Sequence, residues 1–377
     1  MQAAAASSII VFMNTGKLLR LCLVPAAVLL ASCASGNIAA RKGAAPAVSA
    51  DSPAFRYEGR FDRTVSSAPV IIWQGSRVYA DFEGENLALL FGRSTKQNFF
   101  NVSVDGETEV IGVKPGEGAR AAWPRPLKPG RHSLELFKRT EASAGNAVFL
   151  GLELEPGKQA FPPKPPAYRL AMLFFGDSIT AGACNEDGAA DQWDDRSTHN
   201  NALSYAALTA AAFGADYRNI AVSGMGISLG YVEVKAGQAW DRLYPRADSP
   251  RALPEGWTPD VVFVNYGEND YSFTHGKGLP FPADFADGYQ ALVRNIRAAY
   301  PAARIVLLRG GMYGGAQGAE LREAWETAAA KLEASDPAIT RFVFRHWTEN
   351  HPRVADARAL AGELSSWLEG QDFMRGR

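Results

Sequence analysis

Four short segments in the second half of the chain carry side chains that together could transfer an acyl group. In chain order they hold Ser178 after a Gly-Asp pair, Gly224 in a turn, Asn269 after Gly267, and His351 before a proline. A serine can attack a carbonyl carbon, a histidine can take its proton, and N–H groups can stabilise the oxyanion that forms. We therefore interpret Ser178 as a nucleophile and His351 as its base.

These residues follow segments that alternate between strand-like and helix-like patterns over residues 169–372. The expected strands are Leu170–Phe175, Tyr217–Val222, Val261–Tyr266, Arg304–Arg309 and Arg341–Arg345. The expected helices are Leu203–Phe213, Phe285–Tyr300, Ala319–Glu333 and Val354–Leu368. The alternation predicts a parallel α/β sheet covered by helices on both faces, with the flavodoxin-like strand order 2-1-3-4-5. The carboxyl ends of the strands would then rim one crevice, where open α/β sheets keep their ligands.

From residue 54 to residue 156 the pattern is that of an all-β domain. Val78, Ala80 and Phe82 alternate with polar neighbours, and Asp105-Gly106 is a hairpin signal. Glycines and prolines interrupt the rest at short intervals, which predicts a β-sandwich or jelly roll. Four prolines between residues 157 and 168 predict a stiff linker to the second domain.

Residues 1–33 have the features of an export signal. Lys17 and Arg20 precede a short apolar stretch, and Leu30-Ala31-Ser32-Cys33 resembles a bacterial lipobox. That resemblance implies cleavage before Cys33 and a lipid anchor on it, in the periplasm or at the outer membrane or cell surface of a bacterium. The alternative is an ordinary secretory peptide cut after a nearby Ala-x-Ala. The small and polar residues 34–53 predict a flexible tether.

The four segments together resemble the sequence blocks of the SGNH (GDSL-type) hydrolases, in order and at plausible spacing. These blocks are Gly176-Asp177-Ser178, Gly224, Gly267-x-Asn269-Asp270 and His351-Pro352. Further segments resemble carbohydrate esterase family 2, with its N-terminal jelly roll: Tyr57-x-Gly59-Arg60-Phe61, Asn98-Phe99-Phe100-Asn101-Val102, Lys138-Arg139-Thr140-Glu141 and Leu203-Ser204-Tyr205. The resemblance extends from about Phe55 to Leu368.

The resemblance implies a role for each residue of the blocks. Ser178 would be the nucleophile and His351 the general base and later the acid, while the backbone N–H groups of Ser178 and Gly224 and the Asn269 carboxamide would bind the oxyanion. It also implies removal of O-acetyl groups from polysaccharides such as xylan or glucomannan, through an acyl-enzyme and without a cofactor. Two alternatives remain at this stage: a lipase or thioesterase acting on acyl chains, and a carbohydrate-binding lipoprotein without catalysis.

The third member of the triad departs from the pattern of the superfamily. The position three residues before His351, where these hydrolases usually carry Asp, holds Thr348. In carbohydrate esterase family 2 the acid, where present, lies two residues before the histidine, and here that residue is Glu349. We expect Glu349 to orient His351. The alternative is a Ser-His dyad whose imidazole is oriented by a backbone carbonyl.

Several other features bear on ligands. Trp193, in an acidic loop between Glu186 and Asp195, and Tyr313, between strand-like and helix-like segments, could stack on a sugar ring. Trp193 could equally pack on its own domain. Cys184 is expected to be a packing residue, and the chain contains no metal motif of the HExxH or Cys-pair type. With a formal net charge of −1, it offers no basic field for nucleic acid.

Overall fold

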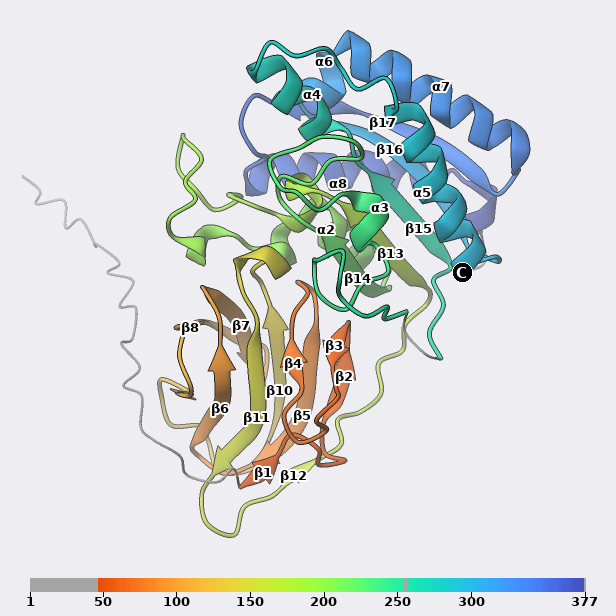
Figure 1. Cartoon of the computed structure of the whole chain (residues 1–377). Coiled ribbons are helices and arrows are strands. Elements are labelled where there is room, and N and C mark those ends of the chain that lie inside the picture. Colours follow the sequence, from red (N-terminus) through yellow and green to blue (C-terminus); the bar gives the residue numbers. More distant parts are fainter. Residues whose placement is uncertain (1–46, 254–255, 376–377) are drawn as a thin grey trace, which may run out of the picture. The chain divides into compact units, whose positions relative to one another are not determined.

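The computed structural model describes residues 47–253 and 256–375 (Figure 1). The expected signal peptide, the lipidated Cys33 and most of the expected tether therefore lie outside the described residues. Within the described part of the chain, no helix is both long enough and apolar enough to cross a membrane.

The N-terminal domain consists of two antiparallel sheets, as the alternating pattern predicted (Figure 1). The first has the order β3-β4-β11-β6-β9, from the strands Phe61–Asp62, Val70–Ile71, Ala147–Leu154, Leu87–Ser94 and Ala119–Ala122. The second has the order β12-β5-β10-β7-β8, from the strands Ala160–Phe161, Arg77–Glu83, Arg131–Lys138, Asn98–Val104 and Glu107–Val113. Every second residue of β5 is buried, so Val78, Ala80 and Phe82 face the core between the sheets.

Both predicted edges of this domain need correction. Residues 48–49 form the short strand β1, which pairs with β11, and Ala50 is fully buried, so the tether prediction is wrong for the end of the 34–53 segment. At the other edge, β12 pairs with β5 inside the predicted proline linker, and Tyr168 donates a hydrogen bond of 2.6 Å to Glu58. The proline-rich segment is therefore attached to the β domain at both its ends. Arg56–Glu58 forms β2, which also pairs with β5.

The second domain has a five-stranded parallel sheet with the predicted order 2-1-3-4-5. Its strands run β14-β13-β15-β16-β17, with the bounds Asp216–Ala221, Ala171–Gly176, Val261–Asn265, Arg304–Met312 and Ile339–Thr348. Every residue of β15 is buried, as is every residue of β13 except Ala171. These strands therefore lack a polar face and could be recognised as continuous apolar runs.

Helices cover both faces of this sheet (Figure 1). One core cluster packs α5 (Phe285–Ala299) and α7 (Ala319–Ser335) on one face, and another packs α2 (Tyr205–Ala212) and α8 (Val354–Glu369) on the other. These four helices match the predicted ones to within two residues at each end. Helix α4 (Glu268–Gly276), which was not predicted, begins directly after β15 and carries Asn269 in its first turn.

Candidate active site

Ser178 is the first residue of the short helix α1 (Ser178–Ala181), just beyond the carboxyl end of β13. Gly176 permits this tight transition, because a Cβ there would come within 2.1 Å of Thr180 Oγ1. The Asp177 carboxylate accepts a hydrogen bond of 3.1 Å from the Ile179 N–H and caps the helix. Ser178 is 3% exposed, and its hydroxyl is hydrogen-bonded to no described residue, so the cap does not occupy the nucleophile.

His351 lies beyond β17, and its ring contacts a carboxylate from a distant loop. His351 Nδ1 is 2.6 Å from Asp191 Oδ2, and the His351 backbone N–H donates to the same oxygen at 3.2 Å. The imidazole is thereby fixed through Nδ1, which leaves Nε2 for proton transfer. No hydrogen bond joins His351 to Ser178 among the described residues, as is common for a catalytic pair without substrate.

The prediction that Glu349 orients His351 is wrong. Glu349 is exposed in the turn after β17, and the hydrogen-bonding partner of the ring is Asp191. The alternative of an orienting backbone carbonyl does not hold either, since a carboxylate accepts from Nδ1. Thr348, at the usual position of the acid, donates instead to the carbonyl oxygen of Asn350 at 2.6 Å.

Arg353 holds Asp191 against His351. Its Nη1 donates to Asp191 Oδ1 at 2.7 Å and to the backbone carbonyl of Cys184 at 3.1 Å. Burial acts to raise the pKa of Asp191, but the hydrogen bonds from His351 and Arg353 outweigh it and lower the pKa below its usual range. The carboxylate therefore stays ionised beside the imidazole. Because Cys184 lies only six residues after Ser178, Arg353 also ties the histidine segment to the nucleophile segment.

The loop after β14 carries Gly224, the expected backbone donor. Gly224 has a φ of +81°, and its carbonyl accepts from the N–H of Tyr231 at 2.8 Å. Asp270, in the first turn of α4, accepts from the three successive N–H groups of residues 227–229 at 2.7–2.9 Å. A buried carboxylate thus fixes the loop that presents Gly224. The sequence block contained Asp270, but the residue pattern gave it no role.

Asn269 brings its carboxamide next to the nucleophile turn. Its Nδ2 donates to Asp177 Oδ2 at 3.1 Å and to the carbonyl oxygen of Met225 at 3.2 Å. These two bonds connect the first, second and third blocks at one edge of the sheet. A developing oxyanion would share an Nδ2 proton with one of these acceptors.

The carboxyl group next to the nucleophile has a strongly raised pKa. Burial raises the pKa of Asp177 to about 8, the negative charge of Glu268 adds to this, and the hydrogen bonds from Ile179 and Asn269 oppose it. Glu268 is itself buried and accepts from two backbone N–H groups, those of residues 314 and 315, at 3.1 and 2.7 Å. The pKa of Asp177 therefore lies well above the usual range of a carboxyl group.

The β domain contributes directly to this region. Glu141, just beyond β10, accepts a hydrogen bond of 2.7 Å from the backbone N–H of Ser223, the residue before Gly224. Its neighbour Arg139 pairs with Glu186 and donates to the carbonyl oxygen of Ser197 at 2.7 Å. Residues 139 and 141 thus hold both the loop of Gly224 and the loop that carries Asp191.

The two aromatic residues predicted to bind substrate occupy different surroundings. Trp193 is 38% exposed and packs edge-on against His351 and His199, with 5.2 Å between ring centroids in each case. Tyr313, 40% exposed, begins the short helix α6 (Tyr313–Gln317) and lies edge-on to Trp347 at 5.8 Å. Trp193 therefore packs on its own domain beside the His351 imidazole and remains partly exposed.

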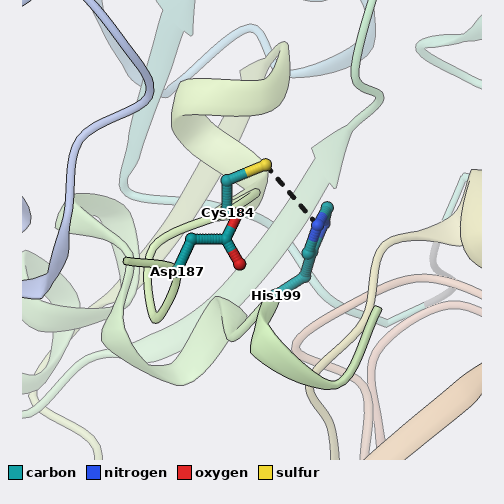
Figure 2. Close-up of side chains that lie close together, drawn as sticks. All are labelled: Cys184, Asp187 and His199. Carbon is teal, nitrogen blue, oxygen red and sulfur yellow. Dashed lines mark hydrogen bonds between the residues drawn. The ribbon is translucent and has the colours of Figure 1, made fainter. Parts of the chain in front are cut away.

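Cys184 is a buried free cysteine in the Asp191 loop, next to Asp187 and His199 (Figure 2). Its Sγ lies 3.5 Å from His199 Nε2, and the Asp187 carboxylate alongside accepts from the Gln192 N–H at 2.8 Å. Burial, reinforced by the charges of Asp191 and Asp187, raises the pKa of the Cys184 thiol. The thiol is therefore kept neutral, which suits a packing residue.

A second histidine, His346, lies near His351 in the sequence but is hydrogen-bonded elsewhere. It lies on β17, and its Nε2 is 2.8 Å from Asp356 Oδ1 of α8. Its side chain therefore connects the strand to the helix.

Two family models match the chain. The model "Carbohydrate esterase 2 N-terminal" matches residues 57–165, and the "GDSL-like Lipase/Acylhydrolase family" matches residues 174–361. The cellulase/esterase CelE of Acetivibrio thermocellus is 32% identical over 273 residues, covering 70% of this chain and 32% of CelE. An acetylxylan esterase/glucomannan deacetylase of Cellvibrio japonicus is 28% identical over 317 residues, covering 79% of this chain and 84% of the relative.

Solved structures agree with these matches. A family two carbohydrate esterase from Clostridium thermocellum, in complex with cellohexaose, aligns with a TM-score of 0.75 and 28% identity, covering 84% of this chain and 98% of that chain. The chain spans about a third of CelE, so that likeness concerns one part of a longer protein. The chain belongs to carbohydrate esterase family 2, in which an N-terminal β domain precedes a GDSL-like hydrolase domain.

Proposed function

We propose that the protein is a serine esterase that removes O-acetyl groups from polysaccharides such as xylan or glucomannan. The observation that carries this proposal is the Asp191–His351 pair tied to the segment after Ser178, in a chain of this esterase family. The named activity of the Cellvibrio japonicus relative, acetylxylan esterase and glucomannan deacetylase, supports the choice of substrate.

The proposed reaction has two steps. Ser178 Oγ attacks the acetyl carbonyl carbon while His351 Nε2 takes the hydroxyl proton, and the oxyanion faces the N–H groups of Ser178 and Gly224 and the Asn269 amide. The tetrahedral intermediate collapses, the C–O bond to the sugar breaks, and His351 returns its proton to the leaving sugar oxygen. Water, deprotonated by His351, then attacks the acetyl-serine, which releases acetate and restores Ser178. Asp191 stabilises the imidazolium in both steps.

Acetate release from acetylated xylan and acetylated glucomannan tests this proposal, with a long-chain ester as a further substrate. Ser178→Ala should abolish release, whereas Ser67→Ala, which changes an exposed serine of the β domain, should leave it unchanged. Retained activity in Ser178→Ala would overturn the assignment. Turnover of the long-chain ester alone would favour the lipase alternative. If none of the three substrates is hydrolysed but the protein still binds glycan, the carbohydrate-binding alternative replaces the esterase proposal.

We also propose that the chain is exported and held at a bacterial membrane by a lipid on Cys33. The lipobox-like Leu30-Ala31-Ser32-Cys33 after an apolar stretch supports this proposal. Labelling with a radioactive fatty acid in a bacterial host should mark the wild-type chain but not Cys33→Ser. A labelled Cys33→Ser chain would refute the assignment of the anchor.

A further inference from the structure

A cavity of about 490 Å³ is lined by residues of both domains. The β domain supplies Arg60 and Trp73, and the edge strand β14 supplies Arg218. This volume falls within the usual range for small-molecule sites. Arg218 pairs in register with Leu173, five residues before Ser178, and none of the proposed catalytic residues lines the cavity.

The charged groups that line the cavity are all positive. Among the described residues, its lining includes Arg60, Arg63 and Arg218 but no Asp or Glu. Arg60 Nη1 donates to two backbone carbonyls, at 3.1 and 2.7 Å, and neither Arg60 nor Arg63 has an ion-pair partner in the described part of the chain. Burial lowers the pKa of Arg60 to about 10, so the guanidinium remains charged at neutral pH. Arg218 forms an ion pair with Asp216 at 3.3 Å, and Asp241, which does not line the cavity, acts on Arg60 through its charge without an ion pair between them.

Aromatic rings hold these guanidinium groups in place. The Arg60 guanidinium lies 5.6 Å from the Trp73 ring centroid, and that of Arg218 lies 4.6 Å from the Trp257 centroid. Both rings line the cavity. Arg218 also donates through Nη1 to the carbonyl oxygen of Gly59 at 3.0 Å. Stacking on a ring leaves the N–H groups that are not engaged in such bonds available for a ligand such as a carboxylate.

Two buried hydroxyl groups at the cavity lack partners. Ser76 Oγ and Tyr300 OH form no hydrogen bond with any described residue, and the two side chains are 1% and 4% exposed. Both residues line the cavity, and the Tyr300 hydroxyl lies within the electrostatic reach of Arg60 and Arg218. A buried hydroxyl without a partner is unfavourable, and a ligand oxygen brought within reach by a small movement of the cavity wall would satisfy it.

We propose that this cavity is a binding site for a sugar that carries a carboxylate, a uronic acid unit. The guanidinium groups would pair with the carboxylate, the two free hydroxyls would bond to sugar oxygens, and the aromatic rings would contact the apolar face of the sugar ring. The choice of a sugar over another carboxylate rests on the proposed action on glycans. The acidic unit would bind at a place separate from Ser178, which does not line the cavity.

Calorimetric titration of the Ser178→Ala full chain with D-glucuronate, D-glucose and inorganic phosphate tests this site without turnover. Glucuronate should bind at least about tenfold more tightly than glucose, because a charge-assisted bidentate pair is worth more than 1.4 kcal/mol. Phosphate should bind more weakly than glucuronate, since it cannot contact the rings. Equal binding of glucose, or tighter binding of phosphate, would overturn the proposal.

Two variants test the residues without disturbing the backbone contacts of Arg60. Arg63→Gln and Tyr300→Phe, added to Ser178→Ala, should each weaken glucuronate binding several-fold, while Arg93→Gln, which changes a side chain 74% exposed, should not. If both variants bind glucuronate with unchanged affinity, the ligand binds outside this cavity and the proposal is wrong. Acetyl ester hydrolysis by the otherwise wild-type chain is measured separately. Glucuronate binding without ester hydrolysis would refute the proposed esterase function and support this binding site. Ester hydrolysis without glucuronate binding would support the esterase function and refute the binding site.

Discussion

Replacing Asp191 by Asn tests whether this carboxylate is the acid that orients His351. The wild-type carboxylate accepts from His351 Nδ1 at 2.6 Å and from Arg353 Nη1 at 2.7 Å. In the variant, the oxygen of the asparagine side chain can still accept from Arg353. The NH₂ group of the asparagine then faces His351 Nδ1. The ring would have to present a lone pair there and carry its proton on Nε2, which is the nitrogen that must accept the proton of Ser178.

The size of the effect follows from two contributions. Loss of a charge-assisted hydrogen bond to the imidazolium costs about 1.5–3 kcal/mol, or roughly 10- to 100-fold in rate. Reversal of the tautomer adds to this, and the equivalent change in the serine protease triad lowers kcat by about 10⁴-fold. We therefore expect a fall in kcat of roughly 10²- to 10⁴-fold in Asp191→Asn, with little change in KM.

Initial rates on acetylated xylan, measured with two control variants, decide the matter. Asp194→Asn changes an exposed carboxylate of the same loop, and Glu349→Gln changes the residue that was first expected to be the acid. Both should retain activity to within about threefold, as is usual for exposed charges. The reasoning is refuted if Asp191→Asn stays within that range, or if Glu349→Gln loses more activity than Asp191→Asn.

Three further variants test the surrounding residues. Asn269→Ala should lower kcat by roughly 10²–10³-fold if its amide binds the oxyanion; a loss below about tenfold in the ester assay would argue against that role. Glu141→Gln weakens the hydrogen bond from the Ser223 N–H and should lower kcat by about tenfold, with KM nearly constant and Tm little changed. An unaltered kcat would show that Glu141 has only a packing role. Because burial raises the pKa of Asp177 to about 8, the stability that this one group contributes is fully present below about pH 4 and is lost as the pH rises towards 8. In calorimetric scans, the fall in Tm between pH 5 and pH 8.5 should therefore be smaller in Asp177→Asn by at least about 2 °C, and an equal fall would contradict the raised pKa.

The parallel sheet could be predicted because its strands are buried on both faces. β15 and β13 contain apolar runs that end in Gly or Asn, so their positions and the residues at their carboxyl ends were visible in the sequence. The strand order agreed with the general rule for this class of fold. Short edge strands gave no such signal: β1 and β12 have two residues each, and only their pairing with β11 and β5 identifies them.

Asp191 could not be assigned from the sequence because it lies 160 residues before the histidine that it contacts. Its loop has five carboxylates in ten positions, and their spacing matches no known ligand pattern. The sequence alone therefore does not show which of them contacts the histidine. The prediction for Glu349 relied on closeness along the chain, which fails here because β17 extends to Thr348 and places the next residue in an exposed turn. Arg353 could have pointed to such a carboxylate. It lies two residues after His351, and a partly buried arginine usually pairs with a carboxylate.

The β domain forms hydrogen bonds with two loops of the hydrolase domain that carry proposed site residues. A GDSL-like domain alone would have to hold the Ser223–Gly224 turn and the Asp191 loop by itself, yet here Glu141 binds the first and Arg139 binds the second. Both loops lack regular secondary structure over long stretches, so external hydrogen bonds limit their motion. An oxyanion donor and an orienting acid must be held to a fraction of an ångström, so with Gly224 and Asp191 in these proposed roles the β domain would support catalysis without touching the acetyl group.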